Sequence, residues 1–197
     1  MPIESKPIDG LAVRTSDWGP DELALLYLDL LGYSDKGEPS LRPRPDENLA
    51  RRPHPRTGFF SGDPVAAPSG DIDVQPLPEP LLETMARAND LLGTRFNVVA
   101  VEHFRNGAVS RPARPGFVSG LVAKSPIAVL GIGVTRQFRV QERVGGGTTV
   151  KKVPLDEGSL FVMGHDFLRR FNFSISLAKK IVEEHFSVTF MEWPSAA

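Results

Sequence analysis

The chain has no cysteine, almost no net charge and no long apolar run, and each absence excludes a class of protein. Without cysteine it can form no disulfide, no thiolate metal site and no cysteine nucleophile, which fits an intracellular protein. The formal charge of -1 provides no overall attraction to nucleic acid or anionic lipid. No apolar run approaches the roughly 18 residues of a membrane-spanning helix, and the N-terminus lacks the apolar core of a signal peptide. We therefore expect a cytoplasmic protein without a membrane partner.

Histidine is scarce as well, which bears on metal binding. The four histidines are His54, His103, His165 and His185, and none has an acidic residue two positions later. A His-x-Asp pair, with which one strand offers two ligands to a transition metal, is therefore missing. A metal site built from His165, Asp166 and His103 is disfavoured, because His103 is expected to point away from the interior of the strand-rich region. We expect no metal site and no bound cofactor.

The length and apolar content are those of one domain. With 197 residues, 41% of them apolar, the chain can bury a full core, so residues 1-197 are predicted to form a single domain. Residues 1-55 would contribute a helix and a loop rich in proline and arginine, and residues 56-193 the core region.

Two helices are predicted in the first half. Pro20, followed by two acids, begins the first helix, whose apolar stripe ends before Gly32. Pro80 opens a second helix over Leu81 to Leu92, which Gly93 closes. Between them the chain is dense in proline and glycine and is expected to be irregular, apart from a short strand near Phe59.

The second half alternates in the manner of strands separated by turns, with Gly145 to Gly147 as a hairpin tip. The predicted strands are residues 96-104, 127-140, 148-153, 159-163, 169-175 and 185-191. Many short strands after two helices indicate an α+β fold: a mostly antiparallel, double-sheet jelly roll supported by two N-terminal helices.

Several phrases in this half occur in a familiar order. They are Phe104-Arg105-Asn106-Gly107, then Thr135-Arg136-Gln137-Phe138-Arg139, then Gly158-Ser159, and finally Phe186-Ser187-Val188-Thr189-Phe190. Together they resemble the AlkB-like branch of the 2-oxoglutarate, Fe(II)-dependent dioxygenases, over roughly Arg56 to Trp193. The resemblance implies a double-stranded β-helix, which agrees with the jelly roll predicted above.

The residues that would carry the family's chemistry are replaced. The resemblance puts the family's His-x-Asp at about Arg114 and Gly116, and its second histidine at Phe173. Neither a guanidinium nor a benzyl ring can bind iron. The two arginines that would hold 2-oxoglutarate become His185 and Met191. We therefore expect that Fe(II)- and 2-oxoglutarate-dependent oxidation has been lost.

The family's Asn-x-Tyr pair becomes Glu102-x-Phe104 here, and a carboxylate at that position would repel the dicarboxylate. By strand periodicity Glu102 faces the same way as Phe104, and His185 the same way as Ser187, Thr189 and Met191. The resemblance turns both faces inward, toward a pocket. Its predicted lining is Asn97, Phe104, Phe173, Ser187, Thr189 and Met191.

Three uses of such a scaffold stay open. In the first, Glu102 and His185 act as general acid and base with Arg114 as an anion partner, in a metal-independent cyclase, isomerase, lyase or hydrolase acting on a small molecule. The non-catalytic alternative is that Glu102 and His185 form a structural pair and that the protein is a ligand-binding pseudoenzyme.

In the second, Arg42 to Arg56, with five arginines against two acids, contacts nucleic-acid phosphates while Phe59 or Phe60 stacks on a base. A solvated loop is the alternative. In the third, the chain regulates a protein partner. The apolar helix near Leu23 to Leu31 is the candidate surface, although a core role is commoner for such a helix.

Overall fold

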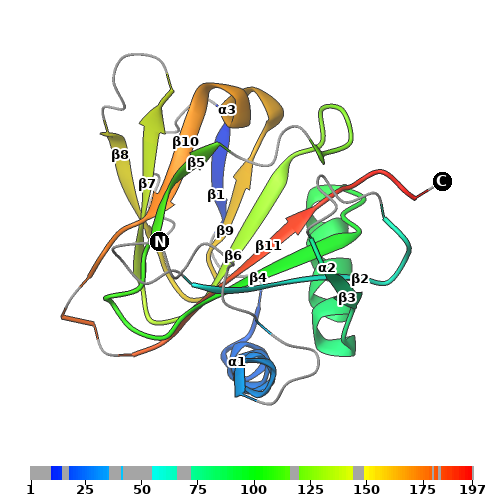
Figure 1. The fold of residues 1–197 in the computed structure, drawn as a ribbon, viewed down its shortest axis with the longest axis horizontal. Helices are drawn as coiled ribbons and strands as arrows, with labels where there is room; N and C mark the ends of the chain where they lie inside the picture. The colour runs from blue at the N-terminus through cyan, green and yellow to red at the C-terminus, as the bar shows by residue number, and fades with distance from the viewer. Residues whose placement is uncertain are drawn as a thin grey trace.

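The computed structural model describes residues 10-14, 18-35, 41, 55-65, 72-115, 120-143, 149-178, 180-181 and 183-196. Two β-sheets face each other, and two long helices lie on the far side of the larger sheet (Figure 1). Within the described ranges, no helix is both long enough and apolar enough to cross a bilayer.

The larger sheet has seven strands in the order β1-β9-β6-β11-β4-β2-β3, and all its neighbours are antiparallel except β2 and β3. Its strands are β1 (Leu11–Arg14), β2 (Arg56–Ser61), β3 (Val74–Pro76), β4 (Val98–Phe104), β6 (Ile127–Gly133), β9 (Leu160–Met163) and β11 (His185–Met191).

The smaller sheet has four antiparallel strands in the order β5-β10-β7-β8. They are β5 (Arg111–Pro115), β7 (Arg136–Glu142), β8 (Thr149–Leu155) and β10 (Phe171–Ile175). The two sheets share no described strand pairing, so they stack without closing into one barrel. The predicted mostly antiparallel α+β class is confirmed.

The helices are α1 (Pro20–Asp35), α2 (Glu79–Leu92) and the short α3 (His165–Arg170). As predicted, α2 has a proline in its first turn and ends at Gly93, whose φ of 63° is the left-handed conformation of a helix cap. Helix α1 continues past Gly32, where the predicted apolar stripe ends, to Asp35. A glycine weakens a helix by only about 1 kcal/mol, and burial of Leu30 outweighs that.

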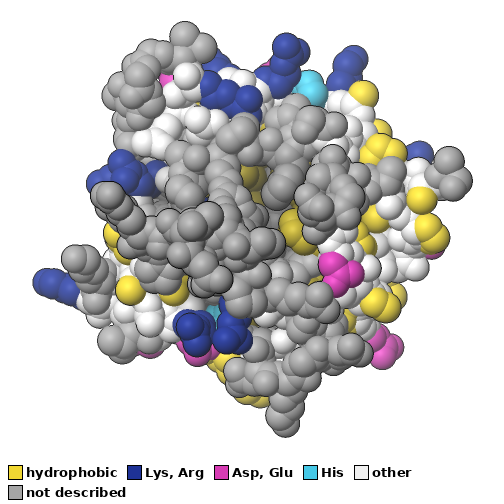
Figure 2. All heavy atoms as spheres, in the orientation of Figure 1, with side chains coloured by type: hydrophobic (Ala, Val, Ile, Leu, Met, Phe, Trp, Pro, Cys, Tyr) yellow, Lys and Arg dark blue, Asp and Glu magenta, His cyan; other side chains and the backbone are white. Residues whose placement is uncertain are grey.

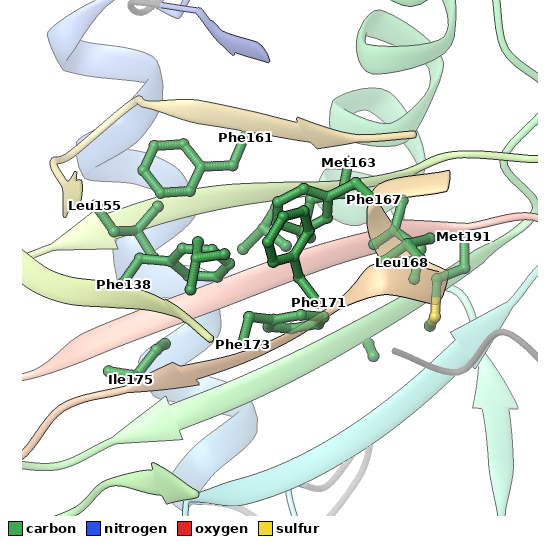
Figure 3. Close-up of a cluster of buried hydrophobic side chains, with 14 of the residues drawn as sticks. Phe138, Leu155, Phe161, Met163, Phe167, Leu168, Phe171, Phe173, Ile175 and Met191 are labelled. Carbon is green, nitrogen blue, oxygen red and sulfur yellow. The ribbon is translucent and has the colours of Figure 1, made fainter. Parts of the chain in front are cut away.

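Each sheet face has its own hydrophobic core. Leucines of α1 and α2 pack on the outer face of the seven-stranded sheet, against Val99, Val101, Phe186, Val188 and Phe190. A second core fills the space between the sheets, and Figure 3 shows its aromatic rings gathered there. That core includes Phe104, Phe138, Phe161, Phe167, Phe171, Phe173, Met163, Met191 and Trp193.

Two predicted strands differ from the observed ones. Residues 127-140 form two strands, because the chain turns after Gly133, whose φ of +83° suits glycine. The first residues of the predicted strand 169-175 belong to α3. The predicted tip at Gly145 to Gly147 lies outside the described residues, although the strands on either side, β7 and β8, are antiparallel neighbours.

Gly107 lies where two loops meet. Its N–H donates to the carbonyl of Ile181 and its own carbonyl accepts from Ala178, each at 2.9 Å. A Cβ at this position would overlap the backbone oxygen of Ala178. We expect Gly107→Ala to lower the free energy of unfolding by about 3 kcal/mol or more, because neither backbone can give way.

Urea denaturation measures this effect. Gly62→Ala is the matched control, since a Cβ there meets nothing within 4 Å. Equal stability of the two variants would contradict the close approach at Gly107.

Candidate functional site

Strands β4 and β11 present the predicted polar residues to the space between the sheets. Ser187 lies opposite Glu102, and His185 opposite Phe104, in the antiparallel register. Opposed residues point to the same face. The alternate residues Phe186, Val188 and Phe190 belong to the core behind the sheet. The two facing predictions made from strand periodicity therefore agree with the structure.

The partner of Glu102 is Arg111 of β5. The Arg111 Nη1 donates to Glu102 Oε2 at 2.6 Å, and their side chains are only 10% and 6% exposed. The Arg111 guanidinium also lies over the ring of Phe173, 4.4 Å from its centroid. This ion pair joins the larger sheet to the smaller one in a largely water-free space.

His185 has other partners and is wholly buried. Its Nδ1 lies 2.8 Å from the carbonyl of Val134, and its Nε2 lies 3.3 Å from Ser187 Oγ. A carbonyl only accepts, so Nδ1 carries the proton and Nε2 accepts from the serine hydroxyl. Burial lowers the pKa of His185 to about 3, the Val134 carbonyl opposes this shift, and the charge of Arg136 adds to it.

Glu102 and His185 therefore share a face and do not share a hydrogen bond. Each is satisfied by a different group: the carboxylate by a guanidinium and the imidazole by a carbonyl and a hydroxyl. At neutral pH the imidazole is uncharged.

The buried imidazole makes stability depend on pH. Its pKa in the folded chain, about 3, lies below the ordinary value of 6.5, so the unfolded chain takes up the proton first as the pH falls. The contribution of the neutral His185 side chain to the free energy of unfolding is fully present above about pH 6.5. It declines as the pH falls from there toward 3. We expect His185 to account for about 2 kcal/mol of lost stability between pH 7 and pH 5.

Urea denaturation of the wild type and His185→Gln at both pH values isolates this contribution. A glutamine amide can still donate to Val134 and does not titrate. If the variant loses as much stability as the wild type between the two pH values, His185 is not buried in the neutral form.

Arg114 and Phe173, which the resemblance assigns to the two histidine positions, are backbone partners on β5 and β10. The two positions are thus adjacent, as two ligands of one metal would need to be. Phe173 is 5% exposed, and its ring stacks on Phe138 at 5.4 Å. Gly116 lies outside the described residues.

These side chains do not fit the cofactors of an oxygenase. At the positions that the resemblance assigns, the chain has the phenyl ring of Phe173 and the carboxylate of Glu102, and a phenyl ring cannot bind a metal ion. Among the described residues, no three or more His, Cys, Asp or Glu side chains gather so that they could hold a metal ion. His103 faces the helix side, stacked on Phe186 at 4.3 Å with its Nε2 3.0 Å from Glu184.

The other predicted lining residues are part of the packing. The Asn97 amide donates to the Trp193 carbonyl at 2.9 Å and accepts from its N–H at 2.8 Å. Phe104 is fully buried beneath the guanidinium of Arg136, 5.2 Å away. Thr189 and Met191 are 6% and 0% exposed.

Two unpaired donors lie beside the ion pair. The Thr57 hydroxyl and the Arg111 Nε are buried and have no hydrogen-bond partner among the residues that the structure describes. Thr57 is opposite Glu102 in the pairing of β2 with β4, so both point between the sheets. Sequence reasoning missed Arg111 and Thr57. The one available signal was an arginine only three positions before Arg114.

The structure gives little support to the predicted nucleic-acid contacts. Most of the segment Arg42 to Arg56 lies outside the described residues. Phe60 is fully buried on the helix side and offers no stacking surface, so that part of the prediction is wrong. Phe59 is partly buried, with its ring 5.8 Å from that of Trp193.

Comparisons with known proteins identify the fold. No family model matches the chain, and no curated protein matches it. A solved structure titled "The structure of OsALKBH1" matches with a TM-score of 0.58 and 13% sequence identity, covering 93% of this chain and 98% of that one. The chain therefore has an AlkB-like fold. At this identity the match carries no information on activity.

Proposed function

We propose that this AlkB-like protein has lost Fe(II)- and 2-oxoglutarate-dependent oxidation and works as a ligand-binding pseudoenzyme. The strongest support is Phe173. Its ring, held between Phe138 and Arg111, occupies the position that the resemblance gives to an iron-binding imidazole. A benzyl side chain donates no electron pair to a metal, so the triad cannot form there.

The two stacked sheets and their strand order support a double-stranded β-helix in a single domain. In that arrangement β4 and β11 of the larger sheet face β5 and β10 of the smaller sheet. The proposed binding site lies between these two pairs of strands.

Binding suits the contacts better than acid and base chemistry does. Glu102 already accepts a hydrogen bond from the Arg111 guanidinium, so this carboxylate is engaged within the fold. His185 already donates its Nδ1 proton to a carbonyl, and its depressed pKa keeps it neutral. Both residues therefore stabilise the interior.

The unpaired donors define the ligand chemistry. Thr57 Oγ1 and Arg111 Nε lie buried near Glu102, and buried donors normally have an acceptor. A small molecule with a carbonyl or carboxylate oxygen would supply it. The neighbouring Phe173 ring favours an apolar or aromatic body on that molecule.

Thermal denaturation in the presence of small aromatic acids and amides tests the proposal. A compound that raises the melting temperature of the wild type, with no such effect on Thr57→Val, supports the site. Thr57→Ser is the matched control, because it keeps the hydroxyl. A stabilising compound that acts equally on all three proteins would place its binding elsewhere, and stabilisation by Mn(II) with 2-oxoglutarate would contradict the proposal.

A further inference from the structure

Helix α1 has an apolar face that the described residues of the chain do not cover. Leu23, Leu26 and Leu30 are buried against the sheet, whereas Leu25 and Leu28 on the opposite side are 65% and 61% exposed. A helix that is apolar on both sides is usually covered on both. Exposing two neighbouring leucines to water is unfavourable, and a partner that covers them would remove this cost.

The rest of this face is small. Ala24 and Gly32 are exposed and lie one turn before and after Leu28. A Cβ at Gly32 would meet nothing within 4 Å, so the packing of the described residues gives no reason for a glycine in the helix. Small residues beside two leucines would let a second helix approach closely.

The surroundings of the face are acidic. Helix α1 contributes Asp21, Glu22 and Asp29 and no basic residue, and of these Glu22 is paired with Arg87 of α2 at 2.8 Å. On the Leu28 side, a hollow of about 420 Å³ separates α1 from the turn after β6. Its described lining contains three glutamates and no lysine or arginine: Ala24, Tyr27, Leu28, Gly133, Val134, Glu157, Glu183 and Glu184.

Together these carboxylates give the hollow a negative electrostatic potential. Burial raises the pKa of Tyr27, and the charges of Glu184 and Glu157 raise it further. Glu157 accepts a backbone N–H from Gly133, which does not cancel its charge. Glu184 contacts His103, whose pKa is lowered by burial, so its partner is a neutral imidazole at neutral pH.

We propose that the outer face of α1, centred on Leu25 and Leu28, docks a basic amphipathic helix of a partner protein. Leucines and small residues match the partner's apolar stripe, and the surrounding acids match its lysines or arginines. A second copy of the chain is a poor occupant, because a symmetric contact through this face would bring two acidic helices together. Many of the basic side chains in view in Figure 2 lie over the region where Figure 1 draws the four-stranded sheet and α3.

The inference is independent of the proposed ligand site, since α1 lies on the opposite side of the seven-stranded sheet from Arg111. It can fail while the ligand site stands, and the reverse also holds.

A synthetic amphipathic peptide of leucine and lysine, about 18 residues or five helical turns long, serves as the probe. We expect saturable binding to the full chain by fluorescence anisotropy, weakened by salt. The double variant Leu25→Ser/Leu28→Ser should bind about tenfold more weakly. The variant Asp21→Asn/Asp29→Asn should bind more weakly at low salt and show a smaller salt dependence.

Leu82→Ser is the matched control, because Leu82 is 47% exposed on α2 and lies outside the proposed face. The control should bind as the wild type does. Equal binding by the double leucine variant, equal binding of a leucine and glutamate peptide, or the absence of binding would overturn the proposal. Sedimentation showing a dimer that the double leucine variant dissociates would instead assign the face to a second copy.

Discussion

Replacing Arg111 with methionine is expected to lower the free energy of unfolding by about 3–5 kcal/mol, because it leaves the Glu102 carboxylate buried without a counter-charge. Methionine keeps much of the apolar contact with Phe173, so the loss reports mainly on charge. Urea denaturation at pH 7 measures it.

The double variant Glu102→Leu/Arg111→Met is the control. It removes both charges together, so it should recover most of the stability lost in Arg111→Met. If the double variant is as unstable as the single one, the loss comes from packing and the ion pair is not what joins the two sheets.

The second large effect is expected for Phe173→His, which restores the imidazole that the resemblance assigns to this position. The polar imidazole would be buried between the Phe138 ring and the Arg111 guanidinium, so we expect a loss of about 2–4 kcal/mol. Metal binding should not appear, because Arg114 and Gly116 supply no other ligand. Calorimetric titration with Ni(II) and urea denaturation measure the two outcomes.

Phe173→Leu keeps an apolar side chain of similar size and should lose less than about 1.5 kcal/mol. Comparable losses in the two variants would show that shape, and not polarity, decides the effect. Metal-dependent stabilisation of Phe173→His would show that the replaced ligands lie elsewhere.

The parts of the fold that local pattern determines were predicted well. The limits of β11 match the prediction for residues 185-191, and α2 begins and ends near its predicted proline and glycine. Alternation along β4 and β11 also gave the residues that share a face, and the resemblance gave the face that points inward. These features depend on residues close in sequence, where strand periodicity and helix capping act directly.

Strand β5 was missed because Pro112 and Pro115 argue against a strand. It lies at the edge of the smaller sheet, where a missing N–H is tolerated. The partner of Glu102 was missed for a different reason. His185 shares its face, but the residue opposite Glu102 is Ser187, which puts His185 on a diagonal about 7–8 Å away. Arg111 reaches Glu102 across the space between two sheets, and no local pattern reports that distance.

The loss of oxygenase chemistry is tested most directly by iron content and succinate release. The full chain, incubated with Fe(II), ascorbate and 2-oxoglutarate without oxygen and then desalted, should retain no stoichiometric iron. On exposure to oxygen it should release no succinate above a protein-free control. One equivalent of bound iron, together with succinate formation that requires the protein, would contradict the proposal that Phe173 and its neighbours have replaced the metal site.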